Sequence, residues 1–187
     1  MTLPDKSTTD DSGFLRRLRA ADPEACETVV RLHWESVYRQ QWLQCFDREL
    51  AADLTQETFV EAWKSVRGFR GESHIRTWLH TLAVRVWQRH LAKRPREQAS
   101  PLTLQTLADP QPGPETVAEQ GVTRERVRAA LQRLPEAQRE SIVLFYQQEM
   151  KYEEIAAAVG IPVGTVKSRL HEGLKRLRQL LGTENHG

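Results

Sequence analysis

Residues 152–181 read Tyr-Glu-Glu-Ile-Ala-Ala-Ala-Val-Gly-Ile-Pro-Val-Gly-Thr-Val-Lys-Ser-Arg-Leu-His-Glu-Gly-Leu-Lys-Arg-Leu-Arg-Gln-Leu-Leu. A short helical pattern comes first, with Ile155 and Val159 one turn apart. Gly160 suits a left-handed helix cap, and Pro162 suits the first turn of a second helix. That second helix carries one apolar stripe, made of Val166, Leu170, Leu174, Leu177 and Leu181. The stretch therefore predicts a helix-turn-helix.

The second helix of this pattern is basic on the face opposite its apolar stripe. That face carries Lys167, Ser168, His171, Lys175 and Arg178. A recognition helix with such a face can enter the major groove of DNA. The alternative is a plain helical hairpin whose charged face is only solvated, which is the commoner origin of a charged face. The short first helix, the Gly-x-Pro turn and the basic second helix together favour DNA binding.

Several strings in and before this motif resemble region 4 of the extracytoplasmic-function sigma factors, small members of the sigma-70 family. They are Leu134-Pro-Glu-Ala-Gln-Arg-Glu, Tyr152-Glu-Glu-Ile-Ala and Pro162-Val-Gly-Thr-Val-Lys-Ser-Arg. The resemblance implies contact with the minus-thirty-five promoter element through Thr165, Lys167, Ser168, Arg169, His171, Glu172 and Lys175. Lys151 departs from the family, which often has Ser or Thr as the helix N-cap. A lysine cannot accept the backbone N–H bonds of the first turn, which weakens the helix start by ~1 kcal/mol.

A second string, Asp53-Leu-Thr-Gln-Glu-Thr-Phe-Val-Glu-Ala-Trp-Lys, predicts an amphipathic helix. Its polar face includes Asp53, Gln56 and Glu57. A solvated face is the ordinary explanation of this pattern. The string also resembles sigma region 2.2, whose polar face docks on the clamp helices of the RNA polymerase β′ subunit. The resemblance therefore implies polymerase contact by these three residues, with the β subunit as a further partner.

A third string, Phe69-Arg-Gly-Glu-Ser-His-Ile-Arg-Thr-Trp-Leu, predicts a glycine-broken loop and then a helix capped by Ser73. It resembles sigma regions 2.3 and 2.4, which hold the melted non-template strand of the minus-ten element. The loop from Phe69 to His74 is the expected base pocket. Arg85 stands where the family often has Asn, which puts the family's role at that position in question. The implied contacts are Phe69, Arg70, Gly71, Ser73, His74, Arg76, Arg85, Arg89 and Lys93.

Apolar residues at helical spacing elsewhere are expected to form the core. In the first half these include Val29, Val37 and Trp34, together with Trp78 and Trp87. In the second half they include Ile142, Val143, Phe145 and Tyr146. No alternation typical of strands is present, so the sequence predicts an all-α fold.

The periodicity divides the chain into two small helical domains joined by a flexible linker. Five prolines between positions 95 and 114 make a continuous helix unfavourable there. The expected organisation is a disordered tail (1–12), a region 2 domain (13–94), a linker (95–122), a region 4 domain (123–182) and a polar tail (183–187).

Composition excludes several other classes of protein. No apolar run reaches membrane-spanning length, and the polar, acidic N-terminus is unlike a signal peptide. Cys26 and Cys45 make no disulfide framework, which fits a reducing cytoplasm. With His33 they also lack the spacing of a zinc finger. No activated nucleophile or phosphate loop is found, so we expect no cofactor, no metal and no enzymatic activity.

The resemblance implies a sigma factor that binds core RNA polymerase, directs it to promoter DNA, assists opening and is held by an anti-sigma factor. The alternative is a helix-turn-helix regulator of duplex DNA that uses residues 13–93 for dimerisation or sensing. A DNA-processing enzyme would need a metal or nucleophile constellation that the sequence lacks.

Overall fold

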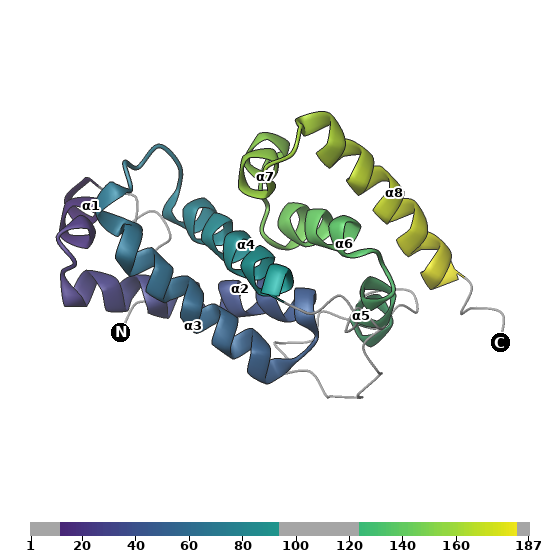
Figure 1. The fold of residues 1–187 in the computed structure, drawn as a ribbon, viewed down its shortest axis with the longest axis horizontal. Helices are drawn as coiled ribbons and strands as arrows, with labels where there is room; N and C mark the ends of the chain where they lie inside the picture. Colours follow the sequence, from purple (N-terminus) through teal and green to yellow (C-terminus); the bar gives the residue numbers. More distant parts are fainter. Residues whose placement is uncertain (1–11, 94–123, 183–187) are drawn as a thin grey trace.

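The computed structural model describes residues 12–93 and 124–182, and these contain helices and turns but no strand (Figure 1). The prediction of an all-α chain with two helical domains is confirmed. The expected linker and tails fall almost wholly outside the described residues.

Within residues 12–93, four α-helices and one 3-10 helix make the first domain. They are α1 (Ser12–Arg19), α2 (Pro23–Cys45), α3 (Arg48–Ser65), the 3-10 helix η2 (Val66–Gly68) and α4 (Ile75–Lys93). Aspartates start two of them: Asp22 Oδ1 accepts from the Ala25 amide at 2.9 Å, and Asp47 Oδ1 accepts from the Leu50 amide at 3.0 Å. Each bond satisfies an amide that the first helical turn leaves without a partner.

In the second domain, residues 124–182 form four α-helices and one π-helical turn. They are α5 (Arg124–Gln132), α6 (Glu136–Ile142), the π-helical turn η4 (Val143–Gln147), α7 (Tyr152–Val159) and α8 (Val163–Gly182). Gly160 ends α7 with φ 76° and ψ 37°, and its amide donates to the Ala156 carbonyl. The predicted left-handed cap is therefore confirmed. The α8 helix begins one residue after Pro162, whose carbonyl accepts from the Val166 amide.

The N-cap position of α7 is held by Lys151, whose side chain has no acceptor. Glu154 Oε2 instead accepts from the Lys151 amide at 2.7 Å. This bond is one half of a capping box. It offsets part of the helix stability that is lost because lysine offers no N-cap acceptor.

Two aromatic side chains that were expected in the core are exposed. Trp34 is 37% exposed and stacks on Phe59 with ring centroids 5.7 Å apart, and Tyr146 is 57% exposed. The prediction of burial was wrong at Trp34 and Tyr146, because an apolar residue at helical spacing still needs a neighbouring element to cover it. Trp87 is 2% exposed and lies in the core as predicted.

The buried stripe of α8 differs from the expected one at its third and last positions. Val166, Leu170 and Gly173 are buried, and Leu177 and Leu180 pack against the same core. Gly173 therefore takes the place expected for Leu174. It lies so near α6 that a Cβ atom there would come 2.8 Å from Ile142 Cδ1.

We expect Gly173→Ala to lower the free energy of unfolding of the second domain by ~1–3 kcal/mol, because the added methyl group overpacks the α6–α8 contact. Urea denaturation followed by circular dichroism measures this change. Gly164→Ala is the matched control, since a Cβ there meets nothing within 4 Å. It should stabilise α8 by ~0.5–1 kcal/mol. Equal effects of the two substitutions would contradict close packing at Gly173.

Candidate nucleic-acid interface

The first turns of α8 present most of the expected base-contacting side chains to solvent. Lys167, Ser168, His171, Glu172 and Lys175 are exposed, whereas Thr165 and Arg169 are partly buried. Ser168 Oγ donates to the Thr165 carbonyl at 3.0 Å, so its hydroxyl is already engaged in the free chain. The Lys167 ammonium lies 5.6 Å from the centroid of the Tyr152 ring.

Beneath this helix lies a buried carboxyl that the sequence did not single out. Glu140 of α6 is buried, and burial raises its pKa to about 7; repulsion from Glu136 adds to the rise, while Arg169 opposes it. The positive charge of Arg169, on the recognition helix α8, therefore favours the ionised form of the Glu140 carboxyl. The one signal for it in the sequence is that Glu140 lies one turn before the apolar residues Val143 and Leu144.

The loop between η2 and α4 forms an open cavity of about 510 Å³. Phe69 and Trp78 provide stacked rings with centroids 4.7 Å apart and planes at 27°. The lining residues are Ser65, Gly68, Phe69, Arg70, Glu72, Ser73 and Trp78. The predicted pocket, the loop from Phe69 to His74, includes four of these residues and missed Ser65, Gly68 and Trp78. An aromatic wall with a polar rim can hold an unstacked base.

The backbone of this loop is fixed at two points. Gly71 has φ 77°, a conformation that suits glycine, and Arg19 Nε donates to the Phe69 carbonyl at 2.6 Å. The prediction that Ser73 caps the next helix was wrong by one residue. The α4 helix begins at Ile75, and the His74 carbonyl accepts from the Trp78 amide, so His74 holds the N-cap position. Ser73 lines the cavity instead.

The basic residues of α4 lie in two kinds of environment. Arg85 and Lys93 are exposed. Arg76 Nη1 donates to Glu149 Oε2 of the second domain at 2.9 Å. Arg89 of α4 is paired within the first domain, 3.1 Å from Glu57 and 3.5 Å from Glu61.

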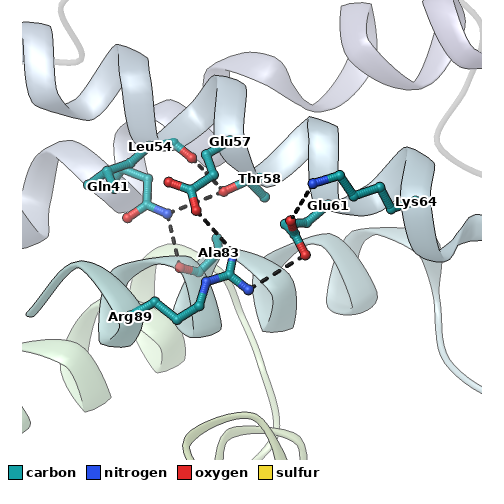
Figure 2. Close-up of polar contacts among 8 residues, drawn as sticks. All are labelled: Gln41, Leu54, Glu57, Thr58, Glu61, Lys64, Ala83 and Arg89. Carbon is teal, nitrogen blue, oxygen red and sulfur yellow. Dashed lines mark hydrogen bonds and ion pairs between the residues drawn. The ribbon is translucent and has the colours of Figure 1, made fainter. Parts of the chain in front are cut away.

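The α3 helix carries the polar face that was expected to bind a protein. Asp53 and Gln56 are exposed, and Glu57 points toward Arg89 (Figure 2). Val60, 43% exposed, follows on the same face and was not among the residues singled out from the sequence. Behind this face, buried Gln41 of α2 donates to the Ala83 carbonyl of α4 at 3.0 Å. Gln41 also donates to Thr58 Oγ1 of α3 at 3.4 Å, so it links α2 to both neighbouring helices.

Across residues 12–93 and 124–182, no three His, Cys, Asp or Glu side chains come together as metal ligands. None of the helices described is both long enough and apolar enough to span a bilayer.

Both domains match known protein families. A family model described as sigma-70 region 2 matches residues 30–97, and one described as sigma-70, region 4 matches residues 124–177. The chain is 36% identical over 142 residues to the ECF RNA polymerase sigma factor EcfG of Rhodopseudomonas palustris. That alignment covers 73% of this chain and 76% of the relative.

Another relative is longer than this chain. The chain is 32% identical over 157 residues to the ECF RNA polymerase sigma factor SigE of Mycolicibacterium smegmatis, covering 83% of this chain but only 61% of the relative. Among solved structures, the sigma factor RpoE in complex with the anti-sigma factor NepR from Bartonella quintana is similar. It superposes with a TM-score of 0.68 at 27% identity, over 83% of this chain and 96% of that chain.

Proposed function

The chain belongs to the extracytoplasmic-function sigma factors of the sigma-70 family, and on this basis we propose how its residues divide the work of transcription initiation. Its function is to bind core RNA polymerase, direct it to specific promoters and assist their opening. The observation that carries the assignment is the presence of both sigma regions, in order, on two helical domains. RNA synthesis is then catalysed by the polymerase and not by this chain. The chain is proposed to act in the cytoplasm.

The exposed face of α3 is the proposed polymerase contact. Asp53, Gln56 and Glu57 offer carboxylates and an amide to basic groups on the β′ clamp helices, and Val60 lies among them. An apolar centre with a polar rim is the usual composition of a protein interface. The acidic groups contribute chiefly to orientation and association rate.

The cavity beside η2 is the proposed site for a base of the melted minus-ten strand. The stacked pair Phe69 and Trp78 supplies an aromatic surface, and Ser73 supplies a hydroxyl at the rim. Basic residues along α4, among them Arg85 and Lys93, are placed for the phosphates of the strand.

We expect Ser73→Ala combined with His74→Ala to slow promoter opening about tenfold and to leave polymerase binding within twofold of wild type. Loss of one or two polar contacts to an unstacked base accounts for an effect of this size. Permanganate footprinting of the melted strand measures opening, and Thr28→Ala on α2 is a control distant in sequence. Normal opening with normal base preference in the double variant would remove this loop from the minus-ten site.

The start of α8 is the proposed reader of the minus-thirty-five element. Its exposed side chains Lys167, His171 and Glu172 stand near the helix N-terminus, where recognition helices meet base edges. Arg169 and Lys175 are assigned to phosphates.

The chain is proposed to act under an anti-sigma factor. The support is its similarity to the sigma factor RpoE, whose solved structure contains the anti-sigma factor NepR. Reconstituted transcription with purified core polymerase tests the assignment as a whole. A sigma factor gives the core enzyme new promoter-specific initiation, whereas a regulator that only binds duplex DNA does not.

A further inference from the structure

The first described helix of the chain lies against the loop that forms the proposed base pocket. Helix α1 contacts the 3-10 helix η2, which leads into this loop (Figure 1). The match to sigma-70 region 2 begins only at residue 30, so it assigns no role to α1. The contacts between α1 and the loop nevertheless bear directly on the shape of the pocket.

Arg19, at the end of α1, supplies a long-range polar contact to this loop. Its Nε donates to the Phe69 carbonyl at 2.6 Å, across 50 positions of sequence. A hydrogen bond from a charged donor is stronger than one between neutral groups. The Phe69 amide donates to the Val66 carbonyl at 3.1 Å, so both backbone polar groups of Phe69 are engaged. The backbone on either side of the Phe69 ring is thereby fixed.

The Arg19 side chain also lies close to Gly71, two residues further along the loop. A Cβ atom at Gly71 would come 3.2 Å from Leu15 Cδ1 and 3.7 Å from Arg19 Nη2. With φ 77°, Gly71 has a backbone conformation that residues with a side chain rarely adopt. The missing side chain therefore lets two residues of α1 approach the loop backbone closely.

Helix α1 can support the loop because it is itself firmly attached to the first domain. Leu18 is fully buried and belongs to the same apolar cluster as Phe69. The helix ends in a turn at Ala21, with φ 57°, where the Asp22 amide donates to the Arg17 carbonyl at 3.1 Å. The Arg17 side chain donates in turn to Asp22 Oδ1 at 2.8 Å. The end of α1 is thus tied to the start of α2.

The ion pair within the loop is a weaker restraint than this support. Arg70 and Glu72 pair at 3.8 Å, but their side chains are 83% and 79% exposed. Exposed ion pairs contribute little to stability because water and salt screen them. The Phe69 ring, meanwhile, depends on its own backbone for its place beside Trp78, with ring centroids 4.7 Å apart. Contact with α1 is therefore the stronger restraint on the shape of the pocket.

We propose that α1 is part of the minus-ten site and that Arg19 is a positioning residue, which holds the loop from Phe69 to Gly71 in the shape that accepts an unstacked base. This inference rests on the proposed function of the cavity beside η2. Arg19 is not among the residues that line the cavity, so it acts through the Phe69 carbonyl and not by touching the base. A pocket already in its binding shape loses less conformational entropy when the base enters.

Two substitutions of matched length separate the hydrogen bond of Arg19 from its charge. Arg19→Gln places an amide N–H where the arginine Nε stands, so it keeps a donor to the Phe69 carbonyl and loses the charge. Arg19→Met has the same length and loses both. Arg16→Met removes the same charge from an exposed position of α1 and is the matched control.

Nuclear magnetic resonance relaxation of the free, full chain tests the support directly. The backbone order parameter of Gly71 should be about 0.85 in wild type and in Arg19→Gln, the value of rigid backbone, and should fall below about 0.6 in Arg19→Met. Arg16→Met should leave it unchanged. A rigid Gly71 in Arg19→Met, or equal mobility in the Gln and Met variants, would overturn the proposal.

Promoter opening by the holoenzyme tests the consequence for function. Arg19→Met should slow opening about tenfold, which is the size of effect expected for one charge-assisted hydrogen bond. Opening by Arg19→Gln and by Arg16→Met should stay within about twofold of wild type, and so should core-polymerase binding by all three variants. Equal slowing in the Gln and Met variants would assign the effect to charge and overturn positioning.

Promoters with single abasic sites in the non-template minus-ten strand show whether Arg19 acts through the pocket. Removal of the base that enters the pocket should slow opening by wild type and should have little further effect on Arg19→Met, because the two changes are coupled. Equal additional losses in both proteins would overturn a role through the pocket. If no abasic site slows the wild-type holoenzyme, the minus-ten assignment is overturned together with the promoter part of this proposal, while the Gly71 order parameters still report whether α1 holds the loop.

Discussion

Reversing two charges on α3, with Asp53→Lys and Glu57→Lys, should weaken binding to core RNA polymerase by about 100-fold, or ~2.8 kcal/mol. The physical reason is that two attractive contacts become two repulsive ones, and like charges facing each other across an interface cost several kcal/mol. Equilibrium binding to purified core polymerase measures the effect, and circular dichroism checks that the helix content is unchanged.

The structure shows how the two substitutions differ. Glu57 already pairs with Arg89 at 3.1 Å, so Glu57→Lys also places a lysine beside that arginine. Asp53 is exposed and makes no ion pair with the residues that the structure describes, so Asp53→Lys alone tests the interface more directly. A matched control is Glu27→Lys with Glu35→Lys, two exposed reversals on α2. Binding should stay within threefold in the control, and equal losses in both pairs would show a general effect of net charge.

Helices and their ends were predictable where the signal is local. Gly160 occupies the left-handed cap that the break between the two C-terminal helices required. Trp87 is buried because its helix presents one apolar face to two neighbours. Gly173 was missed because a glycine adds nothing to hydrophobic periodicity, although its missing side chain is what admits Ile142. Contact with α6 thus shifted the stripe by one residue.

The candidate sites were predictable only in part, because some of their residues come from distant parts of the chain. Resemblance placed the loop from Phe69 to His74, but the cavity is completed by Ser65 and Trp78 from the helices on either side. The contact between domains was not predictable from any local pattern. Ser36 and Gln148 are separated by 112 positions in the chain, and neither stands out from its neighbours in sequence. Such pairs become visible only when the fold is known.

A contact between α7 and α8 also bears on how the recognition helix should be tested. Lys167 lies on an exposed part of α8, and its ammonium contacts the Tyr152 ring of α7. A cation–π contact at an exposed site contributes only ~0.5–1 kcal/mol. A base or phosphate contact can therefore replace it. The experiment is best made with the holoenzyme, in which core polymerase presents the chain to the promoter.

Lys167→Ala should cost ~1–3 kcal/mol of promoter binding if this lysine reads a base, and it should relax selectivity at one position. If the lysine touches only phosphate, binding should fall evenly across sequences and the salt slope should drop by about one. A promoter-library selection with wild-type and variant holoenzymes separates these outcomes. Lys175→Ala, two turns further along α8, is the matched control and should behave as a phosphate contact.

Glu172 sharpens the same experiment, because its carboxylate is exposed near the start of α8. A carboxylate cannot bind guanine as arginine does, but it can accept from the amino group of cytosine. The selected minus-thirty-five element should therefore contain a cytosine at one position, and Glu172→Gln should weaken that preference. If Lys167→Ala alters neither selectivity nor salt slope, and Glu172→Gln leaves the selected sequence unchanged, the start of α8 does not enter the groove. The assignment of this helix face would then be wrong.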